Sequence, residues 1–218
     1  YNRTAQVRYT TGGFSVALED PKSKILDEAS KNGLPTLTAR YESGAGALKY
    51  STAALIQEVG YDDGDTDDSA LGFAVFGAAR YQLTDDLSIQ GNLNYTDGAN
   101  GYLWRSGTNY YGEDAYLNGD SVETIAGYGA NLGATFKVGP GALSVVYGLT
   151  SMDWDDAKED GLNVADKHER NTNAFITYKW SPLKSVTLGA EYGRYEVKKV
   201  NGEEGDANRL MFAAQYNF

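Results

Sequence analysis

Apolar and polar side chains alternate with period two along most of this chain, and this pattern constrains the fold more than any other feature. Residues 209–218 show it most clearly. One face of a strand would carry Leu210, Phe212, Ala214, Tyr216 and Phe218, and the other Arg209, Met211, Ala213, Gln215 and Asn217. Because successive side chains of a strand point to opposite faces, this segment predicts a β-strand with one fully apolar face. Such a face must be covered, and lipid is the candidate cover.

The alternation recurs in eleven segments, which predicts an all-β fold of antiparallel strands. The segments are residues 4–10, 13–20, 35–43, 46–59, 70–84, 87–96, 123–138, 142–153, 172–181, 185–199 and 208–218. The chain has 218 residues, a length that suits a single β-barrel or sandwich domain. No stretch approaches the roughly 18 consecutive apolar residues of a membrane helix. A transmembrane β-barrel stays possible, because its strands are only half apolar.

The connections alternate between short turns and long polar loops. The short turns are Thr11-Gly12, Ser43-Gly44-Ala45, Asp85-Asp86, Gly139-Pro140-Gly141 and Pro182-Leu183-Lys184, and the long links are 21–34, 60–69, 97–122, 154–171 and 200–207. If Phe218 lies at the periplasmic end, every short turn lies there too, which is typical of an outer-membrane up-and-down β-barrel. Bacterial barrels of one chain have even strand numbers. We therefore expect further strands before Tyr1, or a twelfth strand formed by an irregular first segment.

A soluble β-sandwich would show the same alternation, but the aromatic residues favour a membrane barrel. They gather near strand ends on the short-turn side, at Tyr9, Tyr41, Tyr81, Phe136, Tyr178, Trp180, Tyr216 and Phe218. Such a girdle forms where amphipathic rings lie between acyl chains and water. The strict order of short and long connections and the terminal Phe point the same way.

With the apolar face turned to lipid, the opposite face lines a lumen whose charges are mainly positive. Its cations are Arg8, Arg40, Lys49, Arg80, Lys137, Lys179 and Arg209, and its acids are Glu19 and Glu191. All of these cations except Arg209 lie toward the short-turn end, which predicts a basic collar in the periplasmic half. A low-dielectric wall focuses such a field and concentrates small anions. Alternatively, several of the cations pair with carboxylates from a constriction loop or from absent strands.

The surplus acid of this chain, whose net charge is −11, lies in the long loops. An acidic chain argues against nucleic acid as a partner, because phosphates need a basic surface. One loop contains the candidate Ca²⁺ or Mg²⁺ ligands Asp62, Asp63, Asp65, Asp67 and Asp68. Divalent ions could bridge it to anionic lipopolysaccharide, but the order of these acids does not match an EF-hand, so a solvated acidic loop is the favoured interpretation. The longest link, 97–122, is either an outer flap or a segment folded into the pore.

Enzyme chemistry has little support. The chain has no Cys, and His168 is its single His, so a His-based triad or a His-containing metal site has no partners. Gly127-Tyr128-Gly129 lies inside a predicted strand, whereas a dinucleotide fingerprint needs a strand-to-helix turn. We expect neither catalysis nor a cofactor.

Several segments resemble the DcaP-like porins of Gram-negative bacteria. They are QVRYT at 6–10, FSVALEDP at 14–21, LPTLTARY at 34–41, LTDDLSIQGN at 83–92 and RLMF at 209–212. The resemblance covers most of the chain and implies a sixteen-stranded, trimeric channel for small anions such as dicarboxylates. It also implies five strands before Tyr1 and lumen positions for Arg8, Arg40 and Arg80. This chain is too short to close such a barrel without the upstream strands.

The sequence therefore predicts one β-barrel domain over residues 1–218, the C-terminal portion of a longer porin of the Gram-negative outer membrane. We expect a passive diffusion channel for small hydrophilic solutes, with a preference for anions. The expected partners are outer-membrane lipid, lipopolysaccharide, small anionic solutes and further copies in a homotrimer. Two alternatives stay open: a narrow structural or adhesion barrel of about twelve strands that does not conduct, and a soluble β-barrel binding module.

Overall fold

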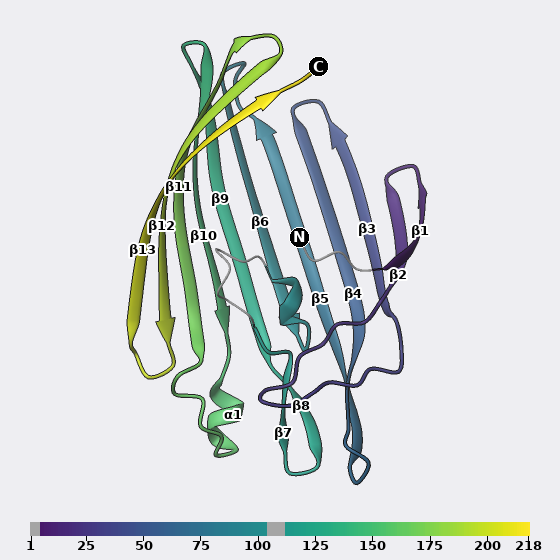
Figure 1. Cartoon of the computed structure of the whole chain (residues 1–218). Helices are drawn as coiled ribbons and strands as arrows, with labels where there is room; N and C mark the ends of the chain where they lie inside the picture. The colour runs from purple at the N-terminus through teal and green to yellow at the C-terminus, as the bar shows by residue number, and fades with distance from the viewer. Residues whose placement is uncertain (1–4, 104–111) are drawn as a thin grey trace.

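The computed structural model describes residues 5–103 and 112–218, and most of them belong to one antiparallel sheet (Figure 1). Its eleven strands are β1 (Gln6–Thr11), β2 (Phe14–Glu19), β3 (Thr36–Ala45), β4 (Leu48–Asp62), β5 (Asp67–Gln82), β6 (Leu87–Asp97), β9 (Ala126–Val138), β10 (Gly141–Met152), β11 (His168–Leu183), β12 (Val186–Lys199) and β13 (Glu204–Tyr216). Each strand pairs with the next in this order, so the topology is up-and-down throughout. The expected eleven segments of alternation are confirmed as strands.

The remaining elements lie in the connections at one end of the sheet. A small hairpin of β7 (Ala115–Asn118) and β8 (Ser121–Thr124) and a 3-10 turn, η1 (Asn100–Tyr102), lie between β6 and β9. A short helix, α1 (Asp155–Glu159), lies between β10 and β11. Neither helical segment in this part of the chain has the length and apolar composition that a membrane-crossing helix needs.

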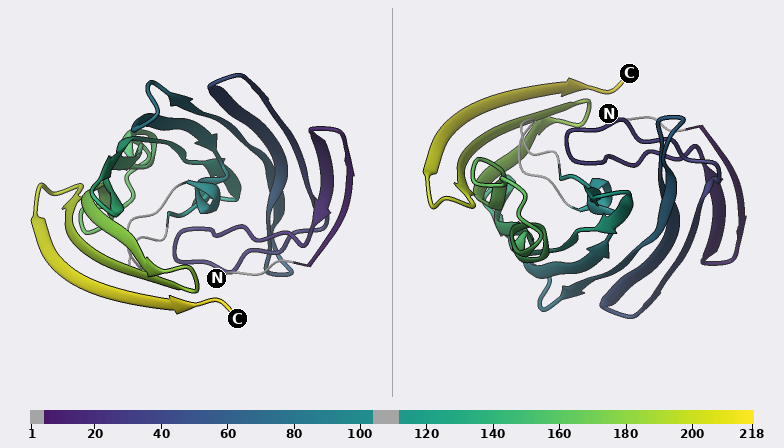
Figure 2. Two further views of the ribbon diagram at one scale, coloured as in Figure 1. Left: turned by 90° about the horizontal axis from the view of Figure 1, so that it is seen from above. Right: turned by 90° about the horizontal axis from the view of Figure 1, so that it is seen from below.

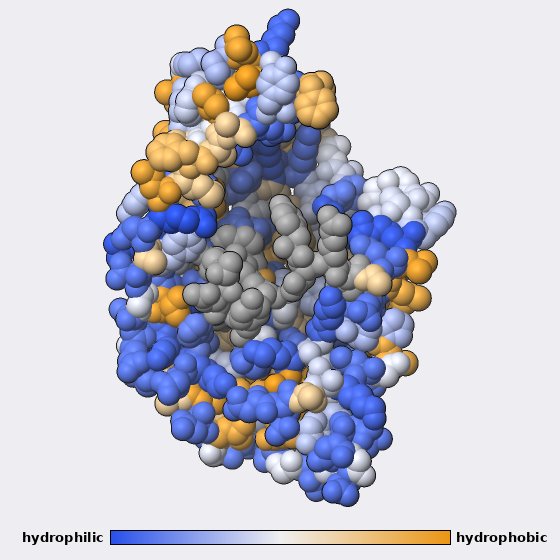
Figure 3. Space-filling view, viewed as in Figure 1, coloured by the Kyte–Doolittle hydropathy of each residue, from blue (hydrophilic) through white to orange (hydrophobic). Residues whose placement is uncertain are grey.

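The sheet curls strongly, so that it has a convex and a concave face (Figure 2). Large apolar side chains on the convex face are exposed, with Leu93 71% exposed, Leu132 67% and Phe212 73%. Their neighbours in sequence face the concave side, as period two requires. Hydrophilic residues predominate over the loop end in the view of Figure 3, whereas hydrophobic ones gather at the upper left and at the right edge. A convex face of this kind suits lipid, and the predicted split between the two faces is found in the structure.

Aromatic rings reinforce the convex face close to the short turns. Tyr178 and Trp180 are stacked with ring centroids 5.4 Å apart, and Tyr41 lies 6.3 Å from Tyr50. The hydroxyl of Tyr178 donates to the carbonyl oxygen of Val138 over 3.0 Å. Rings with an apolar body and a polar tip are suited to the boundary between acyl chains and water.

Five short turns lie together at the end of the sheet where the chain terminates (top of Figure 1). The second and fifth of these turns need correction. The turn after β3 is Gly46-Ala47 rather than Ser43-Gly44-Ala45, because Gly46 adopts φ +56, a left-handed conformation that glycine tolerates best. The turn after β11 is Lys184-Ser185 rather than Pro182-Leu183-Lys184, because Leu183 still pairs with Val186.

Two of the links expected to be long are short. The link 60–69 is wrong, because β4 and β5 continue as a hairpin whose loop is only residues 63–66. There the carboxylate of Asp63 accepts hydrogen bonds from the backbone N–H of Asp65 and Thr66, which closes a tight turn. The link 200–207 is likewise reduced to residues 200–203, because β13 begins at Glu204 rather than at residue 208. The other three links are long, as expected.

Buried apolar residues lie mainly among the loops rather than between layers of sheet. One cluster joins Leu26, Tyr116, Ile125, Met152, Trp154, Ala157 and Val164. A second joins Ile25, Val59, Ala115 and Val122, and a third joins Leu55, Ala74 and Ala99. Loops from distant parts of the sequence therefore pack with one another and with the concave face near the loop end.

Candidate functional site

Alternation in the strands brings the seven predicted cations to the concave face. In the register of the sheet, Lys49 on β4 is directly opposite Arg80 on β5. Lys137 on β9 and Lys179 on β11 both pair with Ala142, so they flank it in one row. All four lie within a few residues of a short turn, as the sequence predicted.

Arg8 and Arg40 form a second group of cations on β1 and β3. Ser15 on β2 is paired with Arg40, and the adjacent concave position of β2, Ala17, is paired with Arg8. Arg8 donates from Nε to the amide oxygen of Gln6 over 3.1 Å. Arg8 and Arg40 are thus held beside adjacent concave-face positions of β2, on either side of that strand.

Three carboxylates share the concave face with these cations. Glu191 accepts a 2.8 Å hydrogen bond from the Thr177 hydroxyl and lies 3.5 Å from Nη2 of Arg209. Glu19 accepts a 3.1 Å hydrogen bond from the Thr38 hydroxyl. The third is Glu42, which forms an ion pair with Arg40. These seven cations outnumber the three carboxylates by four charges, and Asp68 of β5 adds a further carboxylate to the same face at the loop end.

Glu42 is the concave-face acid that sequence reasoning missed. It lies two residues after Arg40 in one strand, and therefore on the same face, so the signal was present in the alternation itself. The cation of Arg209 is also less free than expected, because its guanidinium carbon lies 5.3 Å from the ring centroid of Tyr195 as well as near Glu191. Lys137 lies 3.5 Å from Asp86 in the adjoining turn.

The side chains of β1–β6 and η1 enclose a cavity of about 470 Å³ beside Arg8 and Arg40. Glu19 and Glu42 contribute carboxylates to its wall, and Tyr102 of η1 contributes a phenol ring. Its floor is apolar, with Leu55, Ala74 and Phe76 among the lining residues. The space therefore combines two guanidinium groups with a low-dielectric surface, which strengthens their field.

The described part of the long link after β6 folds against the concave face instead of forming an outer flap (Figure 2). Asn100 is buried and donates from Nδ2 to the carbonyl oxygens of Glu113 and Ile125 over 2.8 and 2.7 Å. It also accepts a 2.5 Å hydrogen bond from Thr96, a concave-face residue of β6. Gly72 of β5 lies so close that an added Cβ would overlap the carbonyl oxygen of Gly98. Part of the predicted link, residues 104–111 with Trp104 and Arg105, lies outside the described residues.

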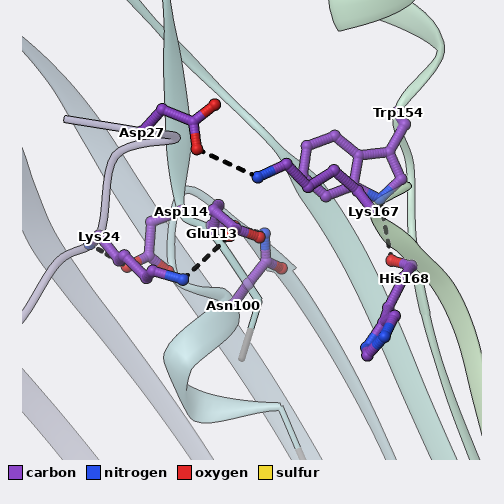
Figure 4. A network of polar contacts seen from close by, with 8 residues as sticks. All are labelled: Lys24, Asp27, Asn100, Glu113, Asp114, Trp154, Lys167 and His168. Carbon is purple, nitrogen blue, oxygen red and sulfur yellow. Dashed lines mark hydrogen bonds and ion pairs between the residues drawn. The ribbon is translucent and has the colours of Figure 1, made fainter. Parts of the chain in front are cut away.

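A second loop, residues 20–35, is tied to the first by polar contacts (Figure 4). The backbone N–H of Lys24 donates to Oδ2 of Asp114 over 2.8 Å, and Nζ of Lys24 donates to Oε1 of Glu113 over 2.9 Å. Backbone bonds from Asp114 N–H to Lys24 O and from Leu26 N–H to Ala115 O extend the junction. Farther along, Lys167 donates to Asp27 over 3.2 Å. The two loops therefore act as one body that narrows the space inside the curved sheet.

Burial raises the pKa of Asp114 to about 6, although backbone N–H donors from Gly101, Lys24 and Asn100 oppose the shift. The carboxylate of Glu113 nearby raises it further. The cause is the loss of water around a carboxyl group that lies between two loops.

Comparison with known proteins supplies the fold. No protein-family model matches the sequence, and no curated protein matches it. The crystal structure of the outer membrane channel DcaP of Acinetobacter baumannii superposes with a TM-score of 0.82 and 23% sequence identity, over 99% of this chain. This chain has a DcaP-like porin fold. The predicted fold class, a transmembrane antiparallel up-and-down β-barrel, is thereby confirmed.

A second porin has a similar architecture, with lower structural similarity and lower sequence identity to this chain. The anion-selective porin from Comamonas acidovorans matches with a TM-score of 0.53 and 13% identity, over 95% of this chain. The chain spans 62% of the DcaP structure and 55% of the Comamonas porin. It therefore represents less than two thirds of either barrel.

The acidic residues of the β4–β5 hairpin have structural partners in this DcaP-like fold. Asp62 forms an ion pair with Lys31, and Asp68 accepts a 2.7 Å hydrogen bond from the backbone N–H of Val122. Across residues 5–103 and 112–218, no three His, Cys, Asp or Glu side chains come together as a metal site would require. The candidate ligands Asp62, Asp63, Asp65, Asp67 and Asp68 thus do not assemble into such a group. His168 is drawn into the loop network through its carbonyl oxygen, which accepts a 3.0 Å bond from Nε1 of Trp154 (Figure 4).

Proposed function

We propose that this chain forms most of a passive diffusion channel for small hydrophilic solutes in the outer membrane of a Gram-negative cell, and that the channel prefers anions such as dicarboxylates. The observation that carries the proposal is the surplus of positive charge on the concave face. In a porin fold this face lines the lumen, so Arg8, Arg40, Lys49, Arg80, Lys137, Lys179 and Arg209 become pore-lining residues, with Glu19 and Glu191 as their acidic counterparts. No catalytic step and no cofactor is part of the proposal.

The physical basis of the preference is the field of these cations within a narrow aqueous space. At physiological ionic strength the Debye length is about 8 Å, so a cation on the wall influences an ion that passes close to it. The loops that pack on the concave face bring passing solutes toward Arg8 and Arg40, whose cavity has an apolar floor. A low-dielectric wall strengthens the attraction of anions and the repulsion of cations.

The solved structures support this proposal through their own descriptions. One is described as an outer membrane channel and the other as an anion-selective porin. Their folds match this chain over nearly its whole length. The exposed apolar convex face and its aromatic residues fit a lipid environment, as an outer-membrane porin requires.

The complete protein, in this proposal, closes the sheet with further strands. β1 and β13 are the edges of the described sheet, and within the described residues they do not pair with each other. Unpaired strand edges are costly in a bilayer, so both edges need partners. Five additional strands would give a sixteen-stranded barrel in one domain, assembled as a homotrimer among lipid and lipopolysaccharide.

The decisive experiment is the reversal potential of the full-length protein in a planar bilayer that separates two KCl concentrations. We expect chloride preference, and we expect Arg8→Ser combined with Arg40→Ser to reduce it. The matched control is Arg194→Ser, which removes the same charge from the convex face, where Arg194 pairs with Glu196 at 2.8 Å. The control should leave the reversal potential unchanged.

Two results would contradict the proposal. Cation preference of the unaltered protein would mean that carboxylates outside the described wall neutralise the concave-face cations. Absence of conductance would favour the alternative function, a narrow structural or adhesion barrel. Heat-modifiable migration on a gel separates a folded membrane barrel from a soluble binding module.

A further inference from the structure

Lys49 and Arg80 form a pair of like charges for which the fold offers no internal explanation. They are direct cross-strand partners in the register of β4 and β5, and both lie on the concave face. Side chains directly opposite one another have Cβ atoms about 5 Å apart, and like charges in this position are destabilising. A sequence that keeps two cations there gains something that offsets the repulsion.

Neighbouring carboxylates do not neutralise this pair. Glu42 lies on the same face one row away, but its carboxylate forms an ion pair with Arg40. The contact that Arg80 makes is a 3.2 Å hydrogen bond from Nη2 to the hydroxyl of Ser88, which carries no charge. Among the described residues, neither Lys49 nor Arg80 takes part in an ion pair.

Mostly neutral polar side chains surround the two cations. A cavity of about 370 Å³ is lined by Lys49 and Arg80 together with Ser51, Gln90, Asn92 and Asn131, and Glu42 is the one carboxylate among its lining residues. Gln90 is the cross-strand partner of Arg80 on β6, and Asn92 pairs with Asn131 on β9. The carboxamide oxygen of Asn92 is buried without a hydrogen-bond partner in the described structure. The cavity thus offers several donors and one open acceptor beside two cations, and its one carboxylate, Glu42, is paired with Arg40.

We propose that Lys49 and Arg80 bind a compact oxyanion of the hydrogenphosphate type, at a binding site separate from the cavity at Arg8 and Arg40. This inference rests on the proposed anion channel and adds a site to it. The planar guanidinium group presents two parallel N–H donors to two oxygens, and the ammonium group presents a compact charge to a third. A dianion neutralises both cations at once, whereas chloride can neutralise only one. The hydroxyl of hydrogenphosphate can in turn donate to the oxygen of Asn92.

The proposed binding site lies closer to the short turns than the cavity at Arg8 and Arg40. On β4, Ala53 is the partner of Arg40, and Lys49 lies four residues nearer the short turn. At about 3.3 Å per residue this is a distance of about 13 Å along the strand. A solute that enters from the loop end and moves along the concave face would therefore pass Arg8 and Arg40 first, and Lys49 and Arg80 second.

The test uses the full-length protein in a planar bilayer in KCl at pH 8, with inorganic phosphate added on the short-turn side. We expect phosphate to block the chloride current in a saturable manner. Lys49→Gln and Arg80→Gln should each raise the half-blocking concentration about tenfold, the change expected when one charge-assisted contact is lost. The matched control is Lys137→Gln, which removes a cation from the same end of the sheet and should change the block less than twofold.

Each outcome of this experiment decides for or against the proposed binding site. An equal phosphate block in the unaltered protein and in both variants would overturn it, and so would an equal loss of block in Lys137→Gln, which would indicate a general field. Arg80→Lys keeps the charge but loses the fork, so it should weaken the block by an intermediate factor and covers the case in which Arg80→Gln fails to fold. Retained chloride preference with unaltered phosphate block would overturn this inference alone. Cation preference of the unaltered protein would overturn the proposed channel with it.

Discussion

Glu42 reduces the positive charge of the concave face beside Arg40. Its carboxylate pairs with Arg40 at the edge of the larger cavity, so much of the charge of that cation is compensated. Both side chains are about half exposed, and exposed pairs of this kind contribute little to folding stability. The pair therefore adjusts the charge of the wall rather than the stability of the sheet.

Replacement of Glu42 should increase anion preference. We expect Glu42→Gln to shift the reversal potential of the full-length protein toward that of chloride, because it frees the guanidinium group of Arg40 without changing the side-chain volume. Glu196→Gln on the convex face is the control, since it releases Arg194 outside the lumen. A shift toward potassium in Glu42→Gln would mean that Arg40 does not face the conduction path.

Asp114 should make the junction of the two inner loops sensitive to pH. Its pKa is raised to about 6 in the folded state, above its ordinary value near 3.8, so the folded protein binds more protons between these values. The contribution of this carboxyl group to stability is therefore greatest below pH 4 and is lost as the pH rises through 6. Lys24 and Glu113 face this carboxyl group, and Nζ of Lys24 donates to Oε1 of Glu113.

The measurement is thermal unfolding of the loop region between pH 4 and pH 7, followed by tryptophan fluorescence. Trp154 packs in the cluster that contains Leu26 and Tyr116, so it reports on the inner loops. We expect Asp114→Asn to remove the part of the pH dependence that falls between pH 4 and 6. Asp63 provides the opposite case. Hydrogen bonds from Thr66, Asp65 and Tyr61 lower its pKa, so its contribution to the stability of the folded protein is lost as the pH falls.

At the scale of elements, the contact of η1 with the sheet depends on the absence of a side chain at Gly72. A Cβ at this position would meet the backbone of Gly98, which has no flexible end that could move aside. We expect Gly72→Ala to displace the inner loop and to lower the free energy of unfolding by about 1–3 kcal/mol, the usual cost of overpacking. Urea unfolding in lipid vesicles would measure it.

Gly77 provides the matched control on the same strand, β5. Nothing lies within 4 Å of a Cβ built there, so Gly77→Ala should have no packing cost. Single-channel conductance gives an independent check, because a displaced loop would change the width of the lumen in Gly72→Ala alone. Equal stability and equal conductance of the two variants would contradict the close contact with Gly98.

The strands were predictable because each element repeats one simple rule. Alternation located all eleven strands, since period two is set by the backbone alone. Strand ends were harder to locate: Gly44 and Gly46 are both suited to a turn, and the carboxylate of Asp63 closes a hairpin that composition describes as a loop. The junction of Lys24 with Asp114 joins positions 90 residues apart, and local sequence carries no signal for such a contact. The inward packing of the described part of the 97–122 link could therefore be found only from the structure.

For the whole molecule, the two faces of the sheet should respond oppositely to charge. Leu132 on the convex face is 67% exposed and belongs to the surface assigned to lipid, whereas its neighbour Asn131 faces the concave side. We expect Leu132→Arg to cost about 2–4 kcal/mol of stability in a bilayer, if the site lies near the midplane. Asn131→Arg should cost much less, because water is available to the charge.

This pair of variants tests the orientation of the whole sheet in one experiment. Urea unfolding of both proteins in lipid vesicles compares the same added charge on adjacent residues. Equal costs would contradict the assignment of the convex face to lipid. In detergent-free buffer, neither variant should refold, which separates the barrel from a soluble domain.

The contacts between the inner loops also determine the order in which this protein assembles. Pairing within the sheet joins strands that are close in sequence, whereas the bond between Lys167 and Asp27 spans 140 residues. Contacts at such separation carry a large loop-closure entropy until the sheet between them has formed. We therefore expect the inner loops to dock last, on a sheet that has already formed. In that order the concave face would be wide when the sheet first forms, and the loops would narrow it only in the final step of folding.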